Sequence, residues 1–248
     1  PRSDSSAASD VYKRQYIMNQ VIKKNFEIDK TKAKRLRSMG VSGLFVQVNK
    51  KNEQSSSKTP QNIDNLNIKE VRNIVQECQS CELHKTRNMS VFGEGNENAQ
   101  IMFIGEAPGK DEDMTGQPFI GRAGQLLDRI IQAMKMKRED IYICNAVKCR
   151  PENNRKPTVD EVKSCSSFLD FQIKKVNPKI IICLGLVAAE YILGENDKLK
   201  NLRGKFYERH GAKILITYHP AALLRDPSKK KLVWEDMQIV MKEVGIDV

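Results

Sequence analysis

The sequence predicts an α/β fold, a three-layer α/β/α sandwich around a central four-stranded parallel sheet. Four short apolar runs, at residues 101–104, 141–147, 180–184 and 214–217, are rich in Ile and Val, as buried parallel strands are. Amphipathic helical patterns separate these runs, and such alternation is typical of a parallel sheet covered on both faces. A chain of 248 residues suffices for one body of this kind with an appendage.

The part of the chain before residue 65 is expected to lie outside this body. Residues 1–15 are small, polar and aperiodic, and they are left out of the fold prediction. Residues 16–48 include a basic run that fits either a solvated helix face or a DNA contact. Residues 49–64 have the polar, serine-containing composition of a flexible linker. We therefore predict an N-terminal extension and linker at 1–64, without an assigned function, and one domain at 65–248.

Apolar residues at helical spacing precede the first predicted strand and fill the segments between the strands. Such patterns occupy residues 68–75, 126–134, 162–169 and 187–193. Thr158 and Glu161 form a capping box at the start of the third of these helices. Asp226 and Pro227 predict the cap and the first position of a final helix that contains Trp234.

The composition favours a nucleic-acid partner. The formal net charge is +11, from 42 Lys and Arg against 31 Asp and Glu, and a basic surface attracts polyanions. Charge alone fits a merely soluble basic protein equally well. The sequence shows no run of 18 or more apolar residues and no secretory signal pattern, so we expect no membrane partner and predict a cytoplasmic location.

Ligands of such sheets bind beyond the carboxyl ends of the strands, so the chemistry is expected in the loops that follow them. The first strand is followed by Gly-Glu-Ala-Pro-Gly at 105–109 and then by a glycine-rich run at 116–124. A tight turn of this composition lets backbone N–H groups approach a ligand and holds Glu106 at the strand edge. An ordinary connection from strand to helix has a similar composition.

The fourth strand is followed by Tyr-His-Pro-Ala-Ala-Leu-Leu-Arg at 218–225, which places one of three histidines, His219, at the same edge. A neutral imidazole can donate a hydrogen bond to an oxygen that gains negative charge. A lone histidine beside a proline also commonly has a structural role. The two leucines suit a wedge pushed between base pairs, and core packing is the alternative.

These loops belong to four motifs by which the chain, from about Val71 to Val244, resembles the family 4 uracil-DNA glycosylases. In family order they are Gly-Glu-Ala-Pro-Gly at 105–109, Gly-Gln-Pro-Phe-Ile-Gly-Arg-Ala-Gly at 116–124, Asn-Ala-Val-Lys-Cys-Arg-Pro at 145–151 and His-Pro-Ala-Ala-Leu-Leu-Arg at 219–225. The resemblance implies a DNA repair enzyme that flips uracil out of single- or double-stranded DNA and hydrolyses its N-glycosidic bond. It implies no lysine nucleophile, so the enzyme should be monofunctional and leave an abasic site in an uncut strand.

The resemblance also implies residue roles. Glu106 would position water and offset positive charge on the sugar, and His219 would stabilise the uracil anion. Phe119 would stack on the base, and Asn145 would read its edge. The other implied residues are Ala107 and Glu112 at the base, with Glu112 beside its fifth carbon, and Leu223, Leu224 and Arg225 in the DNA wedge.

Six cysteines in a reducing compartment indicate a metal or cluster site rather than disulfides. The family resemblance implies a 4Fe-4S cluster held by Cys78, Cys81, Cys149 and Cys165. The first two of these form a C-x2-C pair, and four thiolates from three segments would suit tetrahedral zinc as well, so the choice of iron depends on the resemblance. Cys144 and Cys183 lie in strand patterns and are expected to be core thiols.

Two other functions stay open at this point. One is a DNA-binding module that keeps the fold and the cluster without catalysis, for example as an adaptor to a polymerase. The presence of Glu106, Phe119, Asn145 and His219 argues against it. The other is a sister glycosylase that accepts another damaged base, such as hypoxanthine. The enzyme is expected to be a monomer, with replication or repair proteins as candidate partners.

Overall fold

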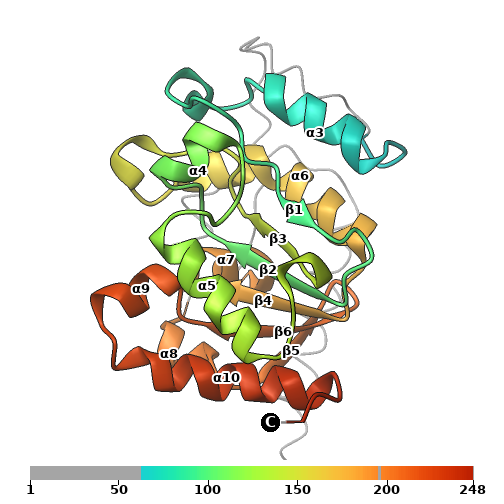
Figure 1. The fold of residues 1–248 in the computed structure, drawn as a ribbon. Helices are drawn as coiled ribbons and strands as arrows, with labels where there is room; N and C mark the ends of the chain where they lie inside the picture. Colours follow the sequence, from blue (N-terminus) through green and yellow to red (C-terminus); the bar gives the residue numbers. More distant parts are fainter. Residues whose placement is uncertain (1–62, 195–196, 248) are drawn as a thin grey trace, which may run out of the picture. The chain divides into compact units, whose positions relative to one another are not determined.

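The computed structural model describes residues 63–194 and 197–247, and the predictions made for residues 1–62 lie outside this part. The strands are β1 (Glu94–Gly95), β2 (Ile101–Gly105), β3 (Tyr142–Asn145), β4 (Ile180–Leu184), β5 (Phe206–Arg209) and β6 (Ala212–Thr217). They form one sheet in the order β1-β3-β2-β4-β6-β5 (Figure 1). The sheet positions the functional loops, because β2, β3, β4 and β6 all run in the same direction.

The four strands predicted from the apolar runs are present and parallel, but the prediction of a four-stranded sheet is wrong. The sheet has six strands and is mixed, since β1 pairs antiparallel with β3 and β5 pairs antiparallel with β6. Strand β1 has two exposed residues, and β5 has no fully buried residue. Neither edge strand therefore has the apolar run that marks a buried strand.

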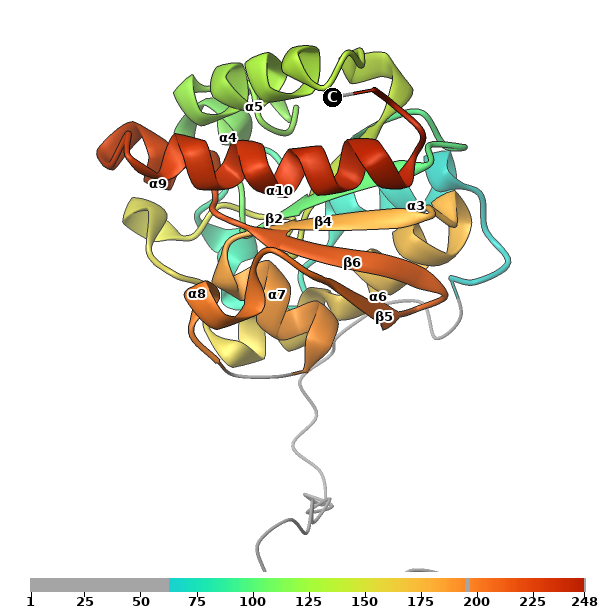
Figure 2. The same cartoon turned by 90° about the horizontal axis from the view of Figure 1, so that it is seen from below.

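Helices cover both faces of the sheet, as the three-layer prediction requires. They are α3 (Ile68–Glu77), α4 (Lys110–Thr115), α5 (Arg122–Ala133), α6 (Val159–Val176), α7 (Leu186–Leu193), α8 (Leu199–Leu202), α9 (Pro220–Arg225) and α10 (Lys229–Glu243), with short 3-10 turns η1 (Glu82–Lys85), η2 (Arg138–Asp140) and η3 (Glu152–Asn154). Figure 2 shows α5 and α10 on one side of the sheet, and α6, α7 and α8 on the other. None of the described helices is long and apolar enough to cross a membrane.

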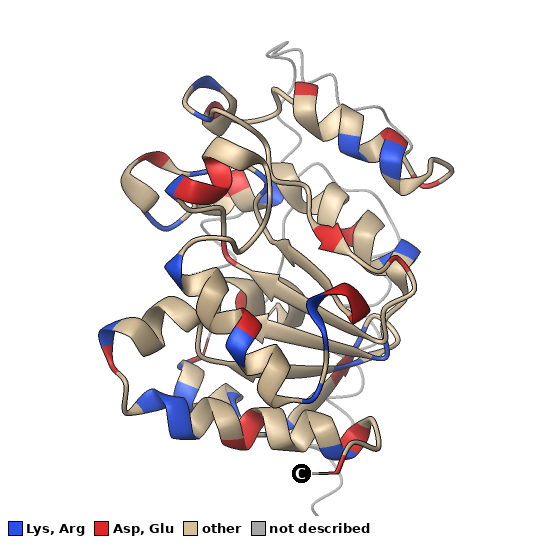
Figure 3. Ribbon diagram, viewed as in Figure 1, with Lys and Arg blue, Asp and Glu red and all other residues tan. Residues whose placement is uncertain are grey.

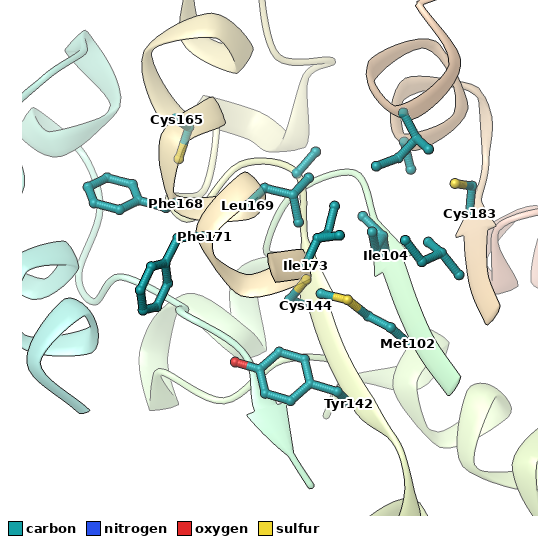
Figure 4. Packing of buried hydrophobic residues seen from close by; sticks show 14 of the residues in the cluster. Met102, Ile104, Tyr142, Cys144, Cys165, Phe168, Leu169, Phe171, Ile173 and Cys183 are labelled. Atoms are coloured by element: carbon teal, nitrogen blue, oxygen red, sulfur yellow. The ribbon is translucent and has the colours of Figure 1, made fainter. Parts of the chain in front are cut away.

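Alternate residues of the four parallel strands belong to two separate cores, as the strand pleat requires. Ile101 and Phe103 of β2 pack in the core that includes α5 and α10. Met102 and Ile104 pack in the core that includes α3, α6 and α7. Figure 4 shows part of the second core, in which the predicted core thiols of Cys144 and Cys183 lie among aliphatic side chains.

The helix predictions hold except near the C-terminus. The capping box is present, because the hydroxyl of Thr158 accepts from the Glu161 amide at 3.2 Å and the Glu161 carboxylate accepts from the Thr158 amide at 2.8 Å. The final helix does not start at Asp226, which instead caps the end of α9. Its carboxylate accepts from the Ser228 amide at 3.2 Å, and α10 starts at Lys229. The short helix α9 itself was not predicted.

Candidate active site and four-cysteine pocket

Four predicted site residues are held near the carboxyl ends of the parallel strands. Gly105 at the end of β2 lies opposite Asn145 at the end of β3, so Glu106 and Asn145 leave the sheet side by side. His219 follows the end of β6 by two residues, and the Phe119 ring lies 5.5 Å from the imidazole, centroid to centroid. We call Glu106, Phe119, Asn145 and His219 the strand-end site.

The amide of Asn145 is buried at 1% exposure, and its Oδ1 has no hydrogen-bond partner among the described residues. A side chain on Gly105 would collide with this oxygen and with the Phe119 ring, so the glycine lets both groups come together over the end of β2. An unsatisfied buried acceptor costs about 1–3 kcal/mol. Such an atom at a strand-end edge indicates a ligand that brings an N–H group.

Phe119 has a left-handed backbone conformation with φ at +52°, which is unfavourable for an aromatic residue. The guanidinium of Arg138 holds this loop, because it donates to the carbonyl oxygens of Pro118 at 2.5 Å and Phe119 at 3.3 Å. Asp128 orients Arg138 through an ion pair of 2.7 Å. No sequence pattern predicts this clamp, because Arg138 and Phe119 are 19 residues apart along the chain.

The carboxylate of Glu112 joins the two glycine-rich segments. It accepts from the amides of Gly109 at 3.0 Å and of Ile120 and Gly121, both at 2.9 Å. Glu112 is therefore engaged in holding the Phe119 loop against the turn that follows β2. Its predicted place beside the fifth carbon of the base stays a prediction.

His219 caps α9 and has a defined tautomer. Its Nδ1 accepts a hydrogen bond from the Ala221 amide at 3.1 Å, so in the neutral ring the proton is on Nε2. Part of the residue is accessible, yet desolvation by the surrounding protein lowers the imidazole pKa to about 4, and Arg225 acts in the same direction. At neutral pH the ring is uncharged and offers Nε2–H as a donor.

Glu106 directly follows β2, at the same edge of the sheet as His219, and is only partly exposed. Burial raises the pKa of its carboxyl above the ordinary 4.5. Lys156 opposes this shift and Glu190 adds to it, and these two side chains form an ion pair at 3.2 Å. Glu106 thus lies in a partly desolvated position, where its carboxyl group takes up a proton more readily than in water.

The predicted wedge residues have different environments. Leu223 is 2% exposed and packs in the core between α5 and α10. It therefore has the core-packing role that was given above as the alternative to a DNA wedge. Leu224 is 38% exposed on the same short helix. Arg225 follows it, and Figure 3 shows basic residues at the end of α9 and at the start of α10.

The four predicted metal ligands gather from three segments around one small pocket. Cys78 lies at the end of α3, Cys81 just before η1 and Cys149 after β3. Cys165 lies in α6, where Figure 4 labels it. Apart from the cysteines, the lining combines apolar side chains with polar and basic ones, and the guanidinium of Arg87 donates to the Cys149 Sγ at 3.0 Å. Burial raises the thiol pKa of Cys149 to about 11 and that of Cys165 to about 12.

The donor chemistry of this pocket fits an iron-sulfur cluster. Within residues 63–194 and 197–247, no three His, Cys, Asp or Glu side chains are grouped as a site for a single metal ion. The four cysteines line one pocket, and four cysteine thiolates are the usual ligands of a four-iron cluster. A bound metal would replace the protons that burial keeps on these thiols.

Comparison with known proteins defines the class of this fold and site. A family model described as the uracil DNA glycosylase superfamily matches residues 92–238. This segment contains the whole strand-end site and two of the four pocket cysteines. The match covers more than half of the chain, and the chain belongs to this superfamily.

Curated relatives narrow the class. A type-4 uracil-DNA glycosylase of Saccharolobus solfataricus is 47% identical over 192 residues, which cover 74% of this chain and 88% of that protein. Type-4 enzymes of Archaeoglobus fulgidus and Thermotoga maritima are 42% and 44% identical, over 69% and 66% of this chain and 88% of each relative. The chain is a member of the type-4 uracil-DNA glycosylases, and the predicted family is confirmed.

Proposed function

We propose that the strand-end site hydrolyses the N-glycosidic bond of uracil in DNA, which releases uracil and leaves an abasic site in an intact strand. The observation that carries this proposal is the buried, unpaired Oδ1 of Asn145 beside the Phe119 ring and a neutral His219. A base with a ring N–H would donate the hydrogen bond that the Asn145 Oδ1 lacks. Its flat face would stack on the Phe119 ring. Membership of the type-4 family supports uracil as that base.

Base recognition follows from the hydrogen-bonding groups of Asn145. Its Oδ1 accepts from the ring N–H of uracil, and its amide nitrogen donates to a ring carbonyl. Cytosine has no ring N–H at that position, and leaving the buried oxygen unpaired is the penalty that rejects it. Phe119 stacks on the base, which is worth about 1–3 kcal/mol. Ala107, next to Glu106, completes the base contact.

Cleavage leaves an electron-deficient sugar and a uracil anion, and two residues act on these opposite charges. The Nε2–H of His219 donates to the uracil carbonyl oxygen that becomes negative. The Glu106 carboxylate faces the sugar, where it offsets positive charge and orients the water that attacks the anomeric carbon. None of these roles needs a lysine nucleophile, so the DNA strand stays uncut.

Extrusion of the base from a duplex costs roughly a few kcal/mol. Leu224 is exposed at the end of α9 and can fill the space that the base leaves, with Arg225 next to it to contact phosphate. Leu223 supports this helix from the core. The base is read after extrusion, so the enzyme should accept single-stranded as well as duplex DNA.

Incubation with oligonucleotides that contain one uracil tests the activity. Alkali-dependent cleavage at the uracil position is expected for both single-stranded and duplex substrates, because alkali cuts only the abasic product. Without alkali the strand should stay intact. Absence of product at an enzyme concentration well above that of the DNA would refute the glycosylase function and favour a DNA-binding module.

We also propose that Cys78, Cys81, Cys149 and Cys165 hold a 4Fe-4S cluster. Four cysteines that line one pocket would serve either a 4Fe-4S cluster or tetrahedral zinc, and membership of the type-4 family supports the cluster. The cluster would tie α3, the segment after β3 and α6 together, and its thiolates would carry negative charge into the protein interior.

The purified protein should be brown and contain about four iron atoms per chain. Replacing Cys149 or Cys165 by alanine should remove the visible absorbance and lower the melting temperature. Cys183→Ala is the matched control, because Cys183 is equally buried but lies in the sheet core away from the pocket. Stoichiometric zinc without iron in protein prepared anaerobically would contradict the cofactor assignment.

The catalytic domain proposed at residues 65–248 carries every residue of the strand-end site on one chain. This supports action as a monomer. The cytoplasmic location and contacts with replication or repair proteins stay predictions.

A further inference from the structure

Lys148 is a fully buried lysine, at 1% exposure, between the strand-end site and the four-cysteine pocket. Lysine is almost never buried without a specific partner. Its Nζ donates to the backbone oxygen of Asn145 at 2.7 Å and to the side-chain oxygen of Gln172 at 2.5 Å. Gln172 is itself fixed, because its amide nitrogen donates to the Phe92 carbonyl at 2.8 Å and to the Tyr142 hydroxyl at 3.0 Å.

The other side of Lys148 contacts the cysteine pocket. Its backbone amide donates to the Cys165 Sγ at 3.3 Å, and the next residue in the chain is Cys149. Lys148 also lines the pocket itself. One residue therefore holds the backbone of the candidate base reader and borders two of the candidate cluster ligands.

The ammonium group has no carboxylate partner. None of the ion pairs formed by residues 63–194 and 197–247 includes Lys148. Its contacts are two neutral oxygens and the face of the Phe92 ring, 6.0 Å from the ring centroid. A buried charge is costly unless an opposite charge compensates it. The group that four thiolates would bind in the adjacent pocket is negatively charged.

We propose that Lys148 is a positioning residue that joins the two sites. Its ammonium holds the backbone of Asn145 in the geometry that reads uracil, and the negative charge of the cysteine-bound cluster stabilises the ammonium in the interior. This inference rests on the proposed function and adds to it a physical link between the cofactor and base recognition. The link is three residues long in sequence, from Asn145 to Lys148.

The test compares iron-loaded wild-type protein with Lys148→Met, which keeps an unbranched side chain one atom shorter and removes the ammonium group. Lys179→Met is the matched control, because Lys179 is an exposed lysine at the opposite end of β4. The first measurement is affinity for a duplex with one 2′-fluorinated deoxyuridine, whose glycosidic bond resists hydrolysis, relative to the same duplex with thymidine. The contribution of phosphate contacts to affinity is the same for both duplexes, so it cancels in this ratio.

Lys148→Met should lower the uracil-to-thymine affinity ratio about fivefold to tenfold, because Asn145 loses a charged hydrogen bond. Its single-turnover rate should fall roughly tenfold to a hundredfold, as expected when a contact residue is misplaced. Affinity for the thymidine duplex and all properties of Lys179→Met should match the wild type. A wild-type ratio and rate in Lys148→Met would overturn the positioning role.

The second measurement is the reduction potential of the bound cluster. Loss of a nearby positive charge should shift it to more negative values in Lys148→Met, whereas Lys148→Arg should stay near the wild type because it keeps the charge. Equal potentials in wild type and Lys148→Met would overturn the charge link. A purely structural defect would not shift the reduction potential in Lys148→Met while leaving it unchanged in Lys148→Arg.

If Lys148→Met does not fold or retain iron, Gln172→Met takes its place, since it removes the acceptor that fixes the ammonium. Its affinity ratio should fall, and an unchanged ratio would overturn the proposal. Failure of the wild type to prefer the fluorinated uracil duplex would instead refute the proposed function. The two failures are thereby distinguished.

Discussion

Replacing either His219 or Glu106 by alanine should lower the single-turnover rate of uracil excision on the order of a hundredfold to a thousandfold. His219→Ala removes a preorganised donor, because the Ala221 amide holds the ring with Nε2–H free. In the proposed mechanism, Glu106→Ala removes the charge that would face the sugar. Both residues would interact more strongly with the transition state than with the bound substrate, so the loss should be in the rate and not in the affinity.

Binding and pH dependence are the controls for these two variants. Affinity for DNA should change little, since it depends on phosphate contacts from a basic surface and falls steeply with salt. The wild-type rate should decline on the acid side as Glu106 takes up a proton, at a pH above its ordinary 4.5 because burial raises its pKa. His219 is neutral throughout that range, as its pKa is lowered to about 4. Glu106→Gln should therefore lose this acid decline along with most of the rate.

Near-normal single-turnover rates in both alanine variants would show that these roles are wrong, even if the protein still excises uracil. A loss of DNA affinity equal to the loss of rate would indicate that His219 and Glu106 only maintain the structure. Thermal melting of each variant separates that outcome from a true catalytic loss.

The sequence predicts the buried part of the sheet well, because burial on both faces leaves a continuous apolar run. Strand β4 was predicted to the residue, at 180–184. The edge strands could not be found in this way, since β1 is two exposed residues long and β5 is partly exposed along its length. The start of α10 was misplaced because Asp226 and Pro227 resemble a helix start, whereas Asp226 ends the unpredicted helix α9.

The placement of the candidate residues near strand ends was predictable, since the topology brings those loops to one edge, and their roles stay predictions. The residues that hold them were not predictable. Polarity suggests an exposed position for both Lys148 and Arg138. In the structure Lys148 is buried in the interior, and Arg138 clamps the Phe119 loop. Glu112 was predicted beside the base, but the pattern could not reveal the three backbone amides that it binds. Such roles depend on which distant segments meet in space.

In the short helix α9, the sequence indicates the helix start, whereas only the fold decides which side chains are buried. His219 followed by Pro220 is a signature of a helix start, with a capping side chain and proline in the first position. The same hydrogen bond that caps the helix also fixes the tautomer of His219. Leu223 and Leu224 are adjacent and chemically identical, and only the direction of the helix decides that the first packs in the core and the second is exposed.

Asn145→Asp should have the second large effect, a loss of uracil excision on the order of a hundredfold or more, because the side chain keeps its acceptors and loses its only donor. The amide of Asn145 lies at 1% exposure, so a carboxylate in its place would be a poorly solvated charge next to the carbonyl oxygen of the base. It would also lie near the uracil anion as this forms, where repulsion adds to the missing hydrogen bond.

The comparison of bases makes this variant informative. The acceptor-only side chain loses its hydrogen bond to the uracil carbonyl, and it gains an acceptor for the amino group of cytosine. Single-turnover rates on matched duplexes with uracil or cytosine should therefore show a much smaller preference for uracil in Asn145→Asp than in the wild type. DNA affinity at one fixed salt concentration should change far less than the rate does. A wild-type preference for uracil in a folded, iron-loaded Asn145→Asp protein would mean that another group reads the base edge, and that the unpaired oxygen over Gly105 has a different partner.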